Sequence, residues 1–410
     1  MRGNTLASST WLHAGLYLHL SSIDVATEFS VYFLCAPELL EPEGAMMTAD
    51  SSRTLLLQRA MLRANSLAAQ GLGLTAPNPI VGAVILDSNG NEISSGFHVG
   101  GDHAEVVAIK NAHAAGFKDL SQSTLVVTLE PCNHQGKTGP CSDAIINAGI
   151  KSVVYAVSDP NSIAQGGAAK LRYAGIEALD GIETEAVALT NRAWLKKIKT
   201  GSPWIIAKIA ATLDGKIAAS DGTSQWITCE ESRRDVAKLR NESDAIVTTT
   251  ATVLADNPDL TPRFDSGINP SGRVKNPVRI VMGERSIPVD YKVNNKSAET
   301  RFIQSRDLSA LLDMARSSGW NQLMIEAGAE FNSALIRAGL IDEILLYQAP
   351  SVLGLGKSFL SNLGITTLQE RITFAYGDIN RVGSDLRIQL LSNPSLVNLL
   401  TVNRFQAGEI

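Results

Sequence analysis

The sequence predicts a mixed α/β protein with two domains of roughly similar size. The chain has 410 residues, and at about 150 residues per domain this length suggests two or three domains. Short apolar runs rich in valine and isoleucine alternate with longer amphipathic segments, a pattern typical of strands and helices that follow one another. Such alternation favours largely parallel sheets that helices cover on both faces.

Composition narrows the class of protein. Hydrophobic residues make up 44% of the chain and charged residues 19%, with a mean hydropathy of +0.05, values typical of a folded protein. The net charge is −5, because 36 Lys and Arg are outnumbered by 41 Asp and Glu; this balance disfavours general nucleic-acid binding. The sequence has no apolar run of about 18 residues, so we expect no membrane span. The four cysteines are too few and too scattered for a disulfide-stapled secreted scaffold, which favours a cytoplasmic protein.

Residues 1–50 differ from the rest of the chain. Up to residue 46 they are acidic, with Arg2 as the single Lys or Arg, and polar residues interrupt their apolar stretches. These features fit neither a secretory signal nor an organelle transit peptide. We therefore expect an extension of unknown role upstream of a second possible start at Met46 or Met47; a small regulatory or oligomerising segment is the alternative.

The first domain is expected over residues 51–199. A helix is predicted from Ser51 toward Gly71, and the apolar run 80–86, followed by the Asp-Ser-Asn-Gly turn at 87–90, predicts a strand. The same patterns predict the remaining elements of this domain: a helix over 104–115, a strand over 125–129, a helix over 142–148 and a strand over 153–157.

The alternation of predicted strands and helices is interrupted at Thr-Gly-Ser-Pro, residues 200–203, and we place a domain boundary there. The second domain is expected over 200–392, with a tail over 393–410. Its predicted strands cover residues 204–209, 245–249, 278–282, 322–325 and 343–347, and its predicted helices cover residues 230–242, 308–317 and 331–338.

A candidate metal site lies in the first domain. His103, Cys132 and Cys141 offer one imidazole and two thiolates, which are three good zinc ligands and leave a fourth tetrahedral position open for water. A zinc ion in such a site makes hydroxide available near neutral pH. Glu105, two residues after the histidine, is placed to carry protons, as the corresponding glutamate does in zinc nucleobase deaminases. These residues predict one catalytic Zn²⁺ ion per chain.

Each part of this pattern has a plain explanation when taken alone. A His-x-Glu sequence is common by chance, and two cysteines eight residues apart can be two buried thiols. The combination, with a predicted strand leading into Pro131-Cys132, favours the catalytic zinc. Cys35 and Cys229 have no ligand partners nearby in the sequence, so we expect them to be unliganded.

The spacing of the thiols distinguishes branches of the deaminases. Generic cytidine-type enzymes have two residues between the cysteines, whereas here eight residues, 133–140, separate them. At this point the chain resembles the family of bifunctional riboflavin-biosynthesis deaminase/reductases, from about residue 51 to about residue 391. The other segments that carry the resemblance are Pro-Asn-Pro-Ile-Val-Gly at 77–82, Thr-Leu-Glu-Pro-Cys at 128–132 and Ser-Asp-Pro-Asn at 158–161.

The resemblance implies a cytidine-deaminase-like three-layer α/β/α domain followed by a dihydrofolate-reductase-like α/β domain. It also implies that His103, Cys132 and Cys141 hold zinc, and that the deaminase substrate is contacted by Asn78, His98, His134 and Lys137. His134 and Lys137 add hydrogen-bond donors and positive charge beside the metal, which suits a phosphorylated pyrimidine.

The second domain has a recognisable strand-to-helix turn at Glu-Ala-Gly-Ala-Glu, residues 326–330. Free amides at the start of a helix suit a cofactor phosphate, and the absence of Gly-x-Gly-x-x-Gly argues against a Rossmann domain. The resemblance implies that NADPH binds here. The residues that it assigns to the cofactor are Ala210, Trp226, Thr252, Asp256, Gly328, Ala329, Glu330, Phe331, Asn332, Ser333 and Ala334.

The same resemblance assigns a ribosyl substrate to this domain. Arg240 and Arg263 suit its 5′-phosphate, because a guanidinium group offers forked, permanently charged donors. Lys208 and Asp214 are expected near the reducible sugar carbon. The full set assigned to this substrate is Lys208, Asp214, Ser224, Arg240, Leu260, Arg263 and Glu326.

The resulting hypothesis is a two-step enzyme of riboflavin biosynthesis. It would deaminate 2,5-diamino-6-ribosylamino-4(3H)-pyrimidinone 5′-phosphate by hydrolysis and then reduce the ribosyl group to a ribityl chain with NADPH. Alternatives are a deaminase whose reductase-like domain is inactive or only binds substrate, a nucleic-acid editing deaminase, which the acidic balance disfavours, and a non-enzymatic zinc module, which would need a closed four-ligand site. We expect a small phosphorylated pyrimidine as the partner, no nucleic acid, no membrane, and a homodimer or homotetramer.

Overall fold

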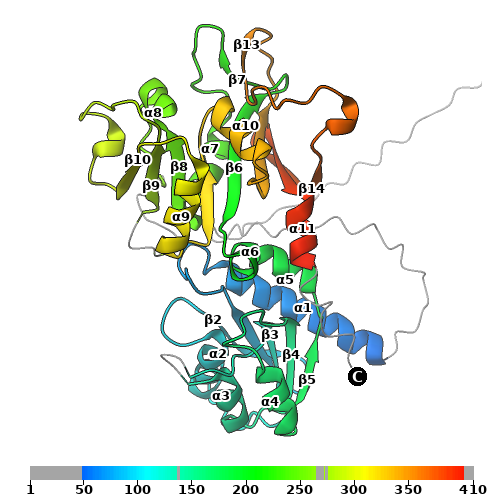
Figure 1. The fold of residues 1–410 in the computed structure, drawn as a ribbon. Coiled ribbons are helices and arrows are strands. Elements are labelled where there is room, and N and C mark those ends of the chain that lie inside the picture. Colours follow the sequence, from blue (N-terminus) through cyan, green and yellow to red (C-terminus); the bar gives the residue numbers. More distant parts are fainter. Residues whose placement is uncertain (1–48, 136–138, 265–271, 273–275, 401–410) are drawn as a thin grey trace, which may run out of the picture. The chain divides into compact units, whose positions relative to one another are not determined.

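The structure of the chain is a computed structural model that describes residues 49–135, 139–264, 272 and 276–400 (Figure 1). Two large sheets and the helices beside them account for most of this part of the chain. The expected extension over 1–50 therefore lies, up to residue 48, outside the described residues. No helix among the described residues is both long and apolar enough to cross a membrane.

The first sheet has five strands in the order β2-β1-β3-β4-β5. The strand β1 runs antiparallel to both β2 and β3, while β3, β4 and β5 run parallel to one another. The strands are β1 (Gly82–Leu86), β2 (Glu92–Phe97), β3 (Thr124–Leu129), β4 (Ser152–Val157) and β5 (Glu177–Asp180).

The expectation of a largely parallel first sheet was wrong, because β2 was not predicted. The strand β2 has the sequence Glu-Ile-Ser-Ser-Gly-Phe and is only partly buried, so it lacks the apolar run by which the other strands were found. The turn at 87–91, where Asp87 accepts hydrogen bonds from the amides of Asn89 and Asn91, is short. A connection this short joins antiparallel strands, so the recognised turn already implied a hairpin.

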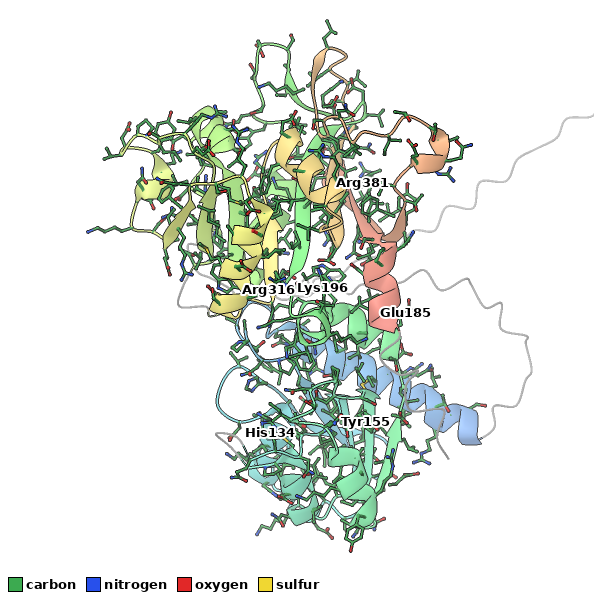
Figure 2. All side chains as sticks on the ribbon, in the orientation of Figure 1. His134, Tyr155, Glu185, Lys196, Arg316 and Arg381 are labelled. Atoms are coloured by element: carbon green, nitrogen blue, oxygen red, sulfur yellow. The ribbon has the colours of Figure 1, made fainter. Side chains whose placement is uncertain are left out.

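Helices cover both faces of this sheet, as expected for three layers. The helices α1 and α5 lie on one face with Val84 and Val126, whereas α2, α3 and α4 lie on the other with Ile85 and Val127. Tyr155 of β4 is buried on that second face (Figure 2). The bounds are α1 (Ala49–Ala69), α2 (Ala104–Ala114), α3 (Cys141–Asn147), α4 (Gly167–Tyr173) and α5 (Thr184–Thr190).

The second sheet has eight strands in the order β10-β9-β8-β11-β6-β12-β15-β14. The first six in this order run parallel, and β15 and β14 continue the sheet antiparallel. The strands are β6 (Trp204–Thr212), β8 (Ala245–Thr249), β9 (Val278–Met282), β10 (Thr300–Ile303), β11 (Gln322–Ile325), β12 (Glu343–Ala349), β14 (Phe374–Val382) and β15 (Asp385–Ser392). A separate two-stranded sheet pairs β7 (Lys216–Ala219) with β13 (Gly356–Ser358).

Helices also flank this second sheet. Ile205 and Val247 share an apolar cluster with α9 and α10, whereas Trp204 and Ile246 belong to a second cluster with residues of α7 and α8. The bounds of the remaining helices are α6 (Arg192–Thr200), α7 (Glu230–Glu242), α8 (Thr250–Asp256), α9 (Leu308–Ser318), α10 (Ala329–Arg337) and α11 (Asn393–Leu400), with short 3₁₀ helices η1 (Lys292–Asn294) and η2 (Leu368–Glu370).

The parallel strands of the second sheet end at one edge. The strands β6, β8 and β11 are adjacent and parallel, so their carboxyl ends lie together; β8 leads into α8, and β11 leads through a short turn into α10. Open parallel sheets bind ligands at this edge. The most regular predicted elements, such as the helix over 230–242 and the strands over 245–249 and 278–282, have the predicted bounds.

Candidate functional site

Two cysteines and a histidine come together beside the first turns of two helices. His103 immediately precedes α2, Cys141 is the first residue of α3, and Cys132 lies in the loop after β3. The Nδ1 atom of His103 lies 3.2 Å from the Sγ atom of Cys141 and 3.5 Å from that of Cys132. Their three ligand atoms all lie within 4.8 Å of one another. This spacing suits a single metal ion.

The donor set of this cluster fits zinc. One imidazole and two thiolates are ligands that Zn²⁺ prefers in tetrahedral sites. Both cysteines are buried, and hydrogen bonds from Cys141 and His103 lower the pKa of the Cys132 thiol. Within the described part of the chain, no fourth histidine, cysteine or carboxylate joins this group. Such an open site is the arrangement of a catalytic zinc rather than of a closed structural zinc.

Glu105 lies in the first turn of α2, close to the cluster, and its side chain is buried. Burial raises the pKa of the Glu105 carboxyl to about 7. A carboxyl group with a pKa near neutrality can both accept and donate a proton. The structure therefore places a proton-carrying group beside the metal ligands, where the sequence pattern expected one.

The four residues expected to contact the deaminase substrate lie in different places. His98 is buried directly beside the cluster, with its ring edge-on to that of His103 at 5.4 Å between centroids. His134 lies in the loop after Cys132 (Figure 2), and its Nδ1 atom is buried without a hydrogen-bond partner among the described residues. Asn78 is exposed in the loop before β1, and its carbonyl accepts from Asn321. Lys137 lies outside the described residues.

Two buried carboxylates near Cys132 received no role from the sequence. The Oε1 atom of Glu130 accepts from the amides of Gly166 and Ala168 at 3.2 and 3.0 Å, and its Oε2 atom accepts from the amide of Asp159 at 3.2 Å. Burial raises the pKa of Asp159 to about 6. The signal that could have found Glu130 is a carboxylate at the end of a buried strand, directly before Pro131-Cys132. Glu130 fastens this end of β3 to α4.

A second cluster of charges lies among the secondary-structure elements of the second sheet. Glu326, directly after β11, is buried between Lys208 of β6, at 3.1 Å, and Arg240 of α7. The Nε and Nη2 atoms of Arg240 donate to the two carboxylate oxygens at 2.5 and 3.0 Å. Burial alone would raise the pKa of Glu326, but Arg240 and Lys208 outweigh it and hold that pKa well below its usual range.

Arg240, one of the two arginines expected to bind the 5′-phosphate, has protein partners in the structure. Its fork is engaged by Glu326, and its Nη1 atom donates to the carbonyl of Thr261 at 3.1 Å. Arg263, the other arginine assigned to the 5′-phosphate, is exposed. Leu260, directly before Thr261 in the chain, is buried and has a positive φ of 58°.

The residues assigned to the cofactor surround the same edge of the sheet. Thr252 lies in the first turn of α8, where its amide donates to Thr249 at 3.3 Å, and Asp256 ends that helix. Ala210 is half-buried on β6, next to Tyr347 of β12. Trp226 is 66% exposed, and the guanidinium of Arg233 lies 4.7 Å from its ring centroid.

The start of α10 fits the phosphate-binding role expected for it. The N-cap residue of this helix is Gly328, which has no side chain. The amides of the first turn therefore receive no hydrogen bond from an N-cap side chain. Atoms at this edge also lack partners: the Oδ1 atom of Asn332 and the Oγ1 atom of Thr248 are buried without hydrogen-bond partners in the described part of the chain. Uncapped amides and unsatisfied polar atoms at strand ends suit a nucleotide cofactor. The other residues assigned to the cofactor in this helix are Ala329, Glu330, Phe331, Ser333 and Ala334, all in its first two turns.

Two other residues assigned to the reductase substrate make contacts within loops. Asp214 lies in the turn after β6, where it accepts from the amides of Leu353 and Gly354 and holds these loops together. These contacts, with the hydroxyl of Thr212, lower the pKa of Asp214. The hydroxyl of Ser224 lies 3.5 Å from a carboxylate oxygen of Asp256. Among the described residues, no hydrogen bond joins Asp214 or Ser224 to Glu326.

Two family models match the chain, one over each sheet. The model of the cytidine and deoxycytidylate deaminase zinc-binding region matches residues 56–157, and the model of the RibD C-terminal domain matches residues 203–386. The first match contains the histidine and both cysteines of the cluster. The second contains the strands and helices whose ends surround Glu326.

Curated proteins similar to this chain carry the name riboflavin biosynthesis protein RibD. The protein from Mycobacterium tuberculosis H37Rv is 41% identical over 325 residues, which cover 78% of this chain and 93% of that protein. The protein from Escherichia coli K12 is 37% identical over 365 residues, which cover 81% of this chain and 98% of that protein.

Solved structures agree with this similarity. A diaminohydroxyphosphoribosylaminopyrimidine deaminase/5-amino-6-(5-phosphoribosylamino)uracil reductase from Thermotoga maritima has a TM-score of 0.75 at 30% identity, covering 83% of this chain and 99% of that one. RibD from Acinetobacter baumannii has a TM-score of 0.73 at 34% identity, covering 82% of this chain and 99% of that one.

Proposed function

This chain belongs to the family of the riboflavin biosynthesis protein RibD, and on that premise we propose the two reactions that it catalyses. It is a bifunctional enzyme of riboflavin biosynthesis, with a deaminase and a reductase. The first reaction is the hydrolytic deamination of 2,5-diamino-6-ribosylamino-4(3H)-pyrimidinone 5′-phosphate. The second is the reduction of the ribosyl group to a ribityl chain by NADPH. The observation that carries the proposal is the metal-ligand cluster beside Glu105, in one chain with the buried Glu326 and its partners Lys208 and Arg240.

In the deaminase, His103, Cys132 and Cys141 would hold one Zn²⁺ ion per chain. When bound, zinc supplies Lewis acidity that makes water a better nucleophile near neutral pH. Glu105 accepts a proton from the attacking water and delivers protons to the substrate and to the departing amino group, which leaves as ammonia. Its burial and its raised pKa support this role.

Four side chains are proposed to hold the pyrimidine phosphate: Asn78, His98, His134 and Lys137. The buried, unsatisfied Nδ1 atom of His134 supports a polar ligand in this place, since such atoms find partners in complete sites. His98 lies against His103, and its Nδ1 atom donates a hydrogen bond to the carbonyl of Asp102, 3.1 Å away, which orients its ring.

In the reductase, NADPH when bound supplies a hydride to the sugar carbon. We propose that it lies along the strand ends, with its phosphates at the amides that begin α10. Support comes from the uncapped helix start and from the unsatisfied atoms of Thr248 and Asn332. Ala210, Trp226, Thr252, Asp256 and residues 328–334 make up the proposed cofactor site.

The ribosyl substrate is proposed to bind beside the cofactor. Glu326, held ionised by Arg240 and Lys208, offers a fixed carboxylate that can accept hydrogen bonds from ribose hydroxyls. Because Arg240 is already engaged, the exposed Arg263 is the better candidate for the 5′-phosphate. Asp214, Ser224 and Leu260 complete the proposed site.

The domain bounds and the assembly are also proposals. We place the extension at 1–50, the deaminase at 51–199, the reductase at 200–392 and the tail at 393–410. The exposed apolar side chains of Tyr376 and Ile379, on the edge strand β14, support a homo-oligomer, either a dimer or a tetramer. We propose that the enzyme acts in the cytoplasm, where its three described free cysteines would stay reduced.

The two reactions can be tested with one preparation of the chain. The diaminopyrimidine phosphate is supplied with and without NADPH, while ammonia, NADPH oxidation and both products are followed. We expect ammonia release without NADPH, and ribityl product and NADPH oxidation only when NADPH is present. Ammonia release without any NADPH oxidation on the deaminated intermediate would instead support the deaminase-only alternative, which the match to the reductase model over 203–386 disfavours.

A further inference from the structure

Arg279 is a fully buried arginine in an apolar strand. It lies in β9, whose sequence is Val-Arg-Ile-Val-Met, and its side chain has 0% exposure. A buried guanidinium group is costly unless acceptors surround it. The partners of Arg279 therefore indicate why a charge is kept in this strand.

The guanidinium of Arg279 fastens two loops that are distant in sequence. Its Nη2 atom donates to the carbonyls of Asn295 and Ala298 at 2.7 and 2.6 Å. Its Nη1 atom lies 3.2 Å from the carbonyl of Asp259, 3.3 Å from the carboxylate of Asp259 and 3.1 Å from the carbonyl of Lys292. Most of these acceptors are backbone carbonyls, so Arg279 fixes the path of the chain rather than of single side chains.

Asp259 joins the two loops from the other side. Its Oδ1 atom, which pairs with Arg279, also accepts from Asn295 at 3.0 Å and from Ser297 at 3.3 Å. Its Oδ2 atom accepts from the hydroxyl of Thr261 at 3.0 Å. The segment 257–261 is thus tied to the segment 292–298 through Arg279 and Asp259.

The tied segment has an unusual backbone. Asn257 and Leu260 have positive φ angles of 42° and 58°, and Leu260 is 1% exposed. The left-handed conformation costs a branched residue such as leucine roughly 1 kcal/mol, so surrounding contacts must hold it. On the opposite side of Leu260 from Asp259, the carbonyl of Thr261 accepts from Arg240, whose fork binds Glu326. Leu260 therefore lies between contacts to two arginines.

We propose that Arg279 is a positioning residue of the reductase: it fixes the loop 257–263 so that Leu260 and Arg263 meet the ribosyl substrate. The inference rests on the proposed reductase function, because that function gives Leu260 and Arg263 their ligand. Arg279 itself is fully buried and acts through its contacts with the loop. A lysine cannot take its place, since one ammonium group cannot reach acceptors on both sides of a planar fork.

The test compares Arg279→Lys with Arg301→Lys. Arg301 lies on the neighbouring strand β10 and binds Glu299 and Ser318; within the described part of the chain, none of its hydrogen bonds reaches the loop 257–263. Because replacing a buried arginine can impair folding, Asn295→Ala is the second variant. Asn295 is exposed, and its replacement by alanine removes one contact to Arg279 and one to Asp259. The deaminase activity of each variant shows whether the chain is still folded.

For Arg279→Lys we expect the KM for the deaminated ribosyl substrate to rise about tenfold or more, because the loop is misplaced. The dissociation constant of NADPH, measured by fluorescence titration, and the deaminase kcat/KM should stay within about twofold. Amide hydrogen exchange over 257–261 should become faster. Asn295→Ala should shift KM and exchange in the same direction by less, and Arg301→Lys should shift neither.

Two results would overturn the inference. The first is unchanged hydrogen exchange over 257–261 in both variants, which shows that Arg279 does not hold the loop. The second is faster exchange with an unchanged KM for the ribosyl substrate, which leaves Arg279 a purely structural role. Failure of the unsubstituted chain to oxidise NADPH would overturn the proposed reductase function, and the exchange measurement would still decide whether Arg279 fixes the loop.

Discussion

Glu105 is buried in the first turn of α2, close to the sulfur atoms of Cys132 and Cys141. Burial disfavours its ionised form, which is why its carboxyl can hold a proton near neutral pH. At the residue scale, the proposed deaminase mechanism thus assigns proton transfer to a single buried group close to the candidate metal ligands.

Replacing this group tests its role directly. Glu105→Gln keeps the size of the side chain but cannot accept a proton, so we expect zinc content to stay unchanged and ammonia release to fall by about 10²–10⁴-fold. Reduction of the deaminated intermediate by the same variant is the control and should be unaffected. Full ammonia release by the variant would remove Glu105 from proton transfer.

Glu326 gives a second prediction, with a defined dependence on pH. Its pKa is held below the ordinary value of 4.5 in the folded state, so its ion pairs stabilise the fold at pH values above about 4.5, and this contribution is lost as pH falls further. Glu326→Gln leaves Lys208 and Arg240 without their buried partner and should destabilise the chain by about 3–5 kcal/mol at neutral pH.

Thermal unfolding measured from pH 7 down to pH 3 checks this. The difference in midpoint between Glu326→Gln and the unsubstituted chain should be constant above about pH 5 and shrink below about pH 4.5. Glu230→Gln, which removes an exposed pair with Arg234, is the matched control and should change little. A difference that grows on acidification would contradict the ionised state assigned to Glu326.

The candidate metal ligands could be predicted from the sequence, whereas residues that hold loops in place could not. His103, Cys132 and Cys141 are recognisable because few residue types bind zinc and each has a characteristic spacing. The side chain of Glu130 acts through partners that are 29 or more residues away in the chain, such as Asp159. The side chain of Arg279 acts through partners that are 13 or more residues away, such as Lys292. Only the fold shows what such residues touch.

At the scale of elements, the packing of α4 against the loop after β3 places Cys132. Gly167, the first residue of α4, lies so close that a Cβ atom there would be 1.7 Å from the carbonyl oxygen of Pro131. Because that neighbour is backbone, it cannot turn aside as a side chain could. The helix and the metal-binding loop can approach each other only through a glycine.

Gly167→Ala should therefore push the loop away from α4 and move Cys132. We expect deaminase activity or zinc affinity to fall about tenfold or more, while reduction of the deaminated intermediate is retained. Gly139→Ala is the matched control and should keep both, because Gly139 lies in the loop that carries Cys132 and no atom of the described residues is within 4 Å of its Cβ position. Equal behaviour of the two variants would show that this approach does not position the ligand.

Some strands of the two sheets could be predicted from the sequence and others could not, for a physical reason. Continuous buried runs such as β8 and β9 were found because both of their faces are covered. The strands β2 and β14 are partly exposed and mixed in composition, so no pattern of period two or continuous apolarity distinguishes them from loops. Because β2 was not predicted, the first sheet was wrongly expected to be largely parallel.

At the scale of the whole molecule, one chain carries two sites that belong to different sheets. The zinc ligands lie beside the first sheet, and the charges around Glu326 lie beside the second. Contacts such as the ion pairs of Arg192 with Glu343 and of Lys196 with Asp342 join α6 to the second sheet. The chemistry of each site nevertheless comes from its own residues.

Removal of zinc should separate the two activities. Dialysis against a chelator is expected to abolish ammonia release while the reduction of supplied deaminated intermediate continues at an unchanged rate, since no metal ligand belongs to the reductase site. Addition of Zn²⁺ should restore deamination, because binding reforms the site from deprotonated thiols. Loss of both activities on chelation, with recovery of both on adding zinc, would contradict this independence.

X-ray absorption at the zinc edge tests the central claim most directly. For the purified chain with one zinc ion, we expect two sulfur ligands at about 2.3 Å and two lighter ligands at about 2.0 Å, of which His103 provides one and solvent the other. Cys141→Ser should reduce the sulfur count to one. A site with three or four sulfur ligands, or a chain that binds no zinc, would contradict the account.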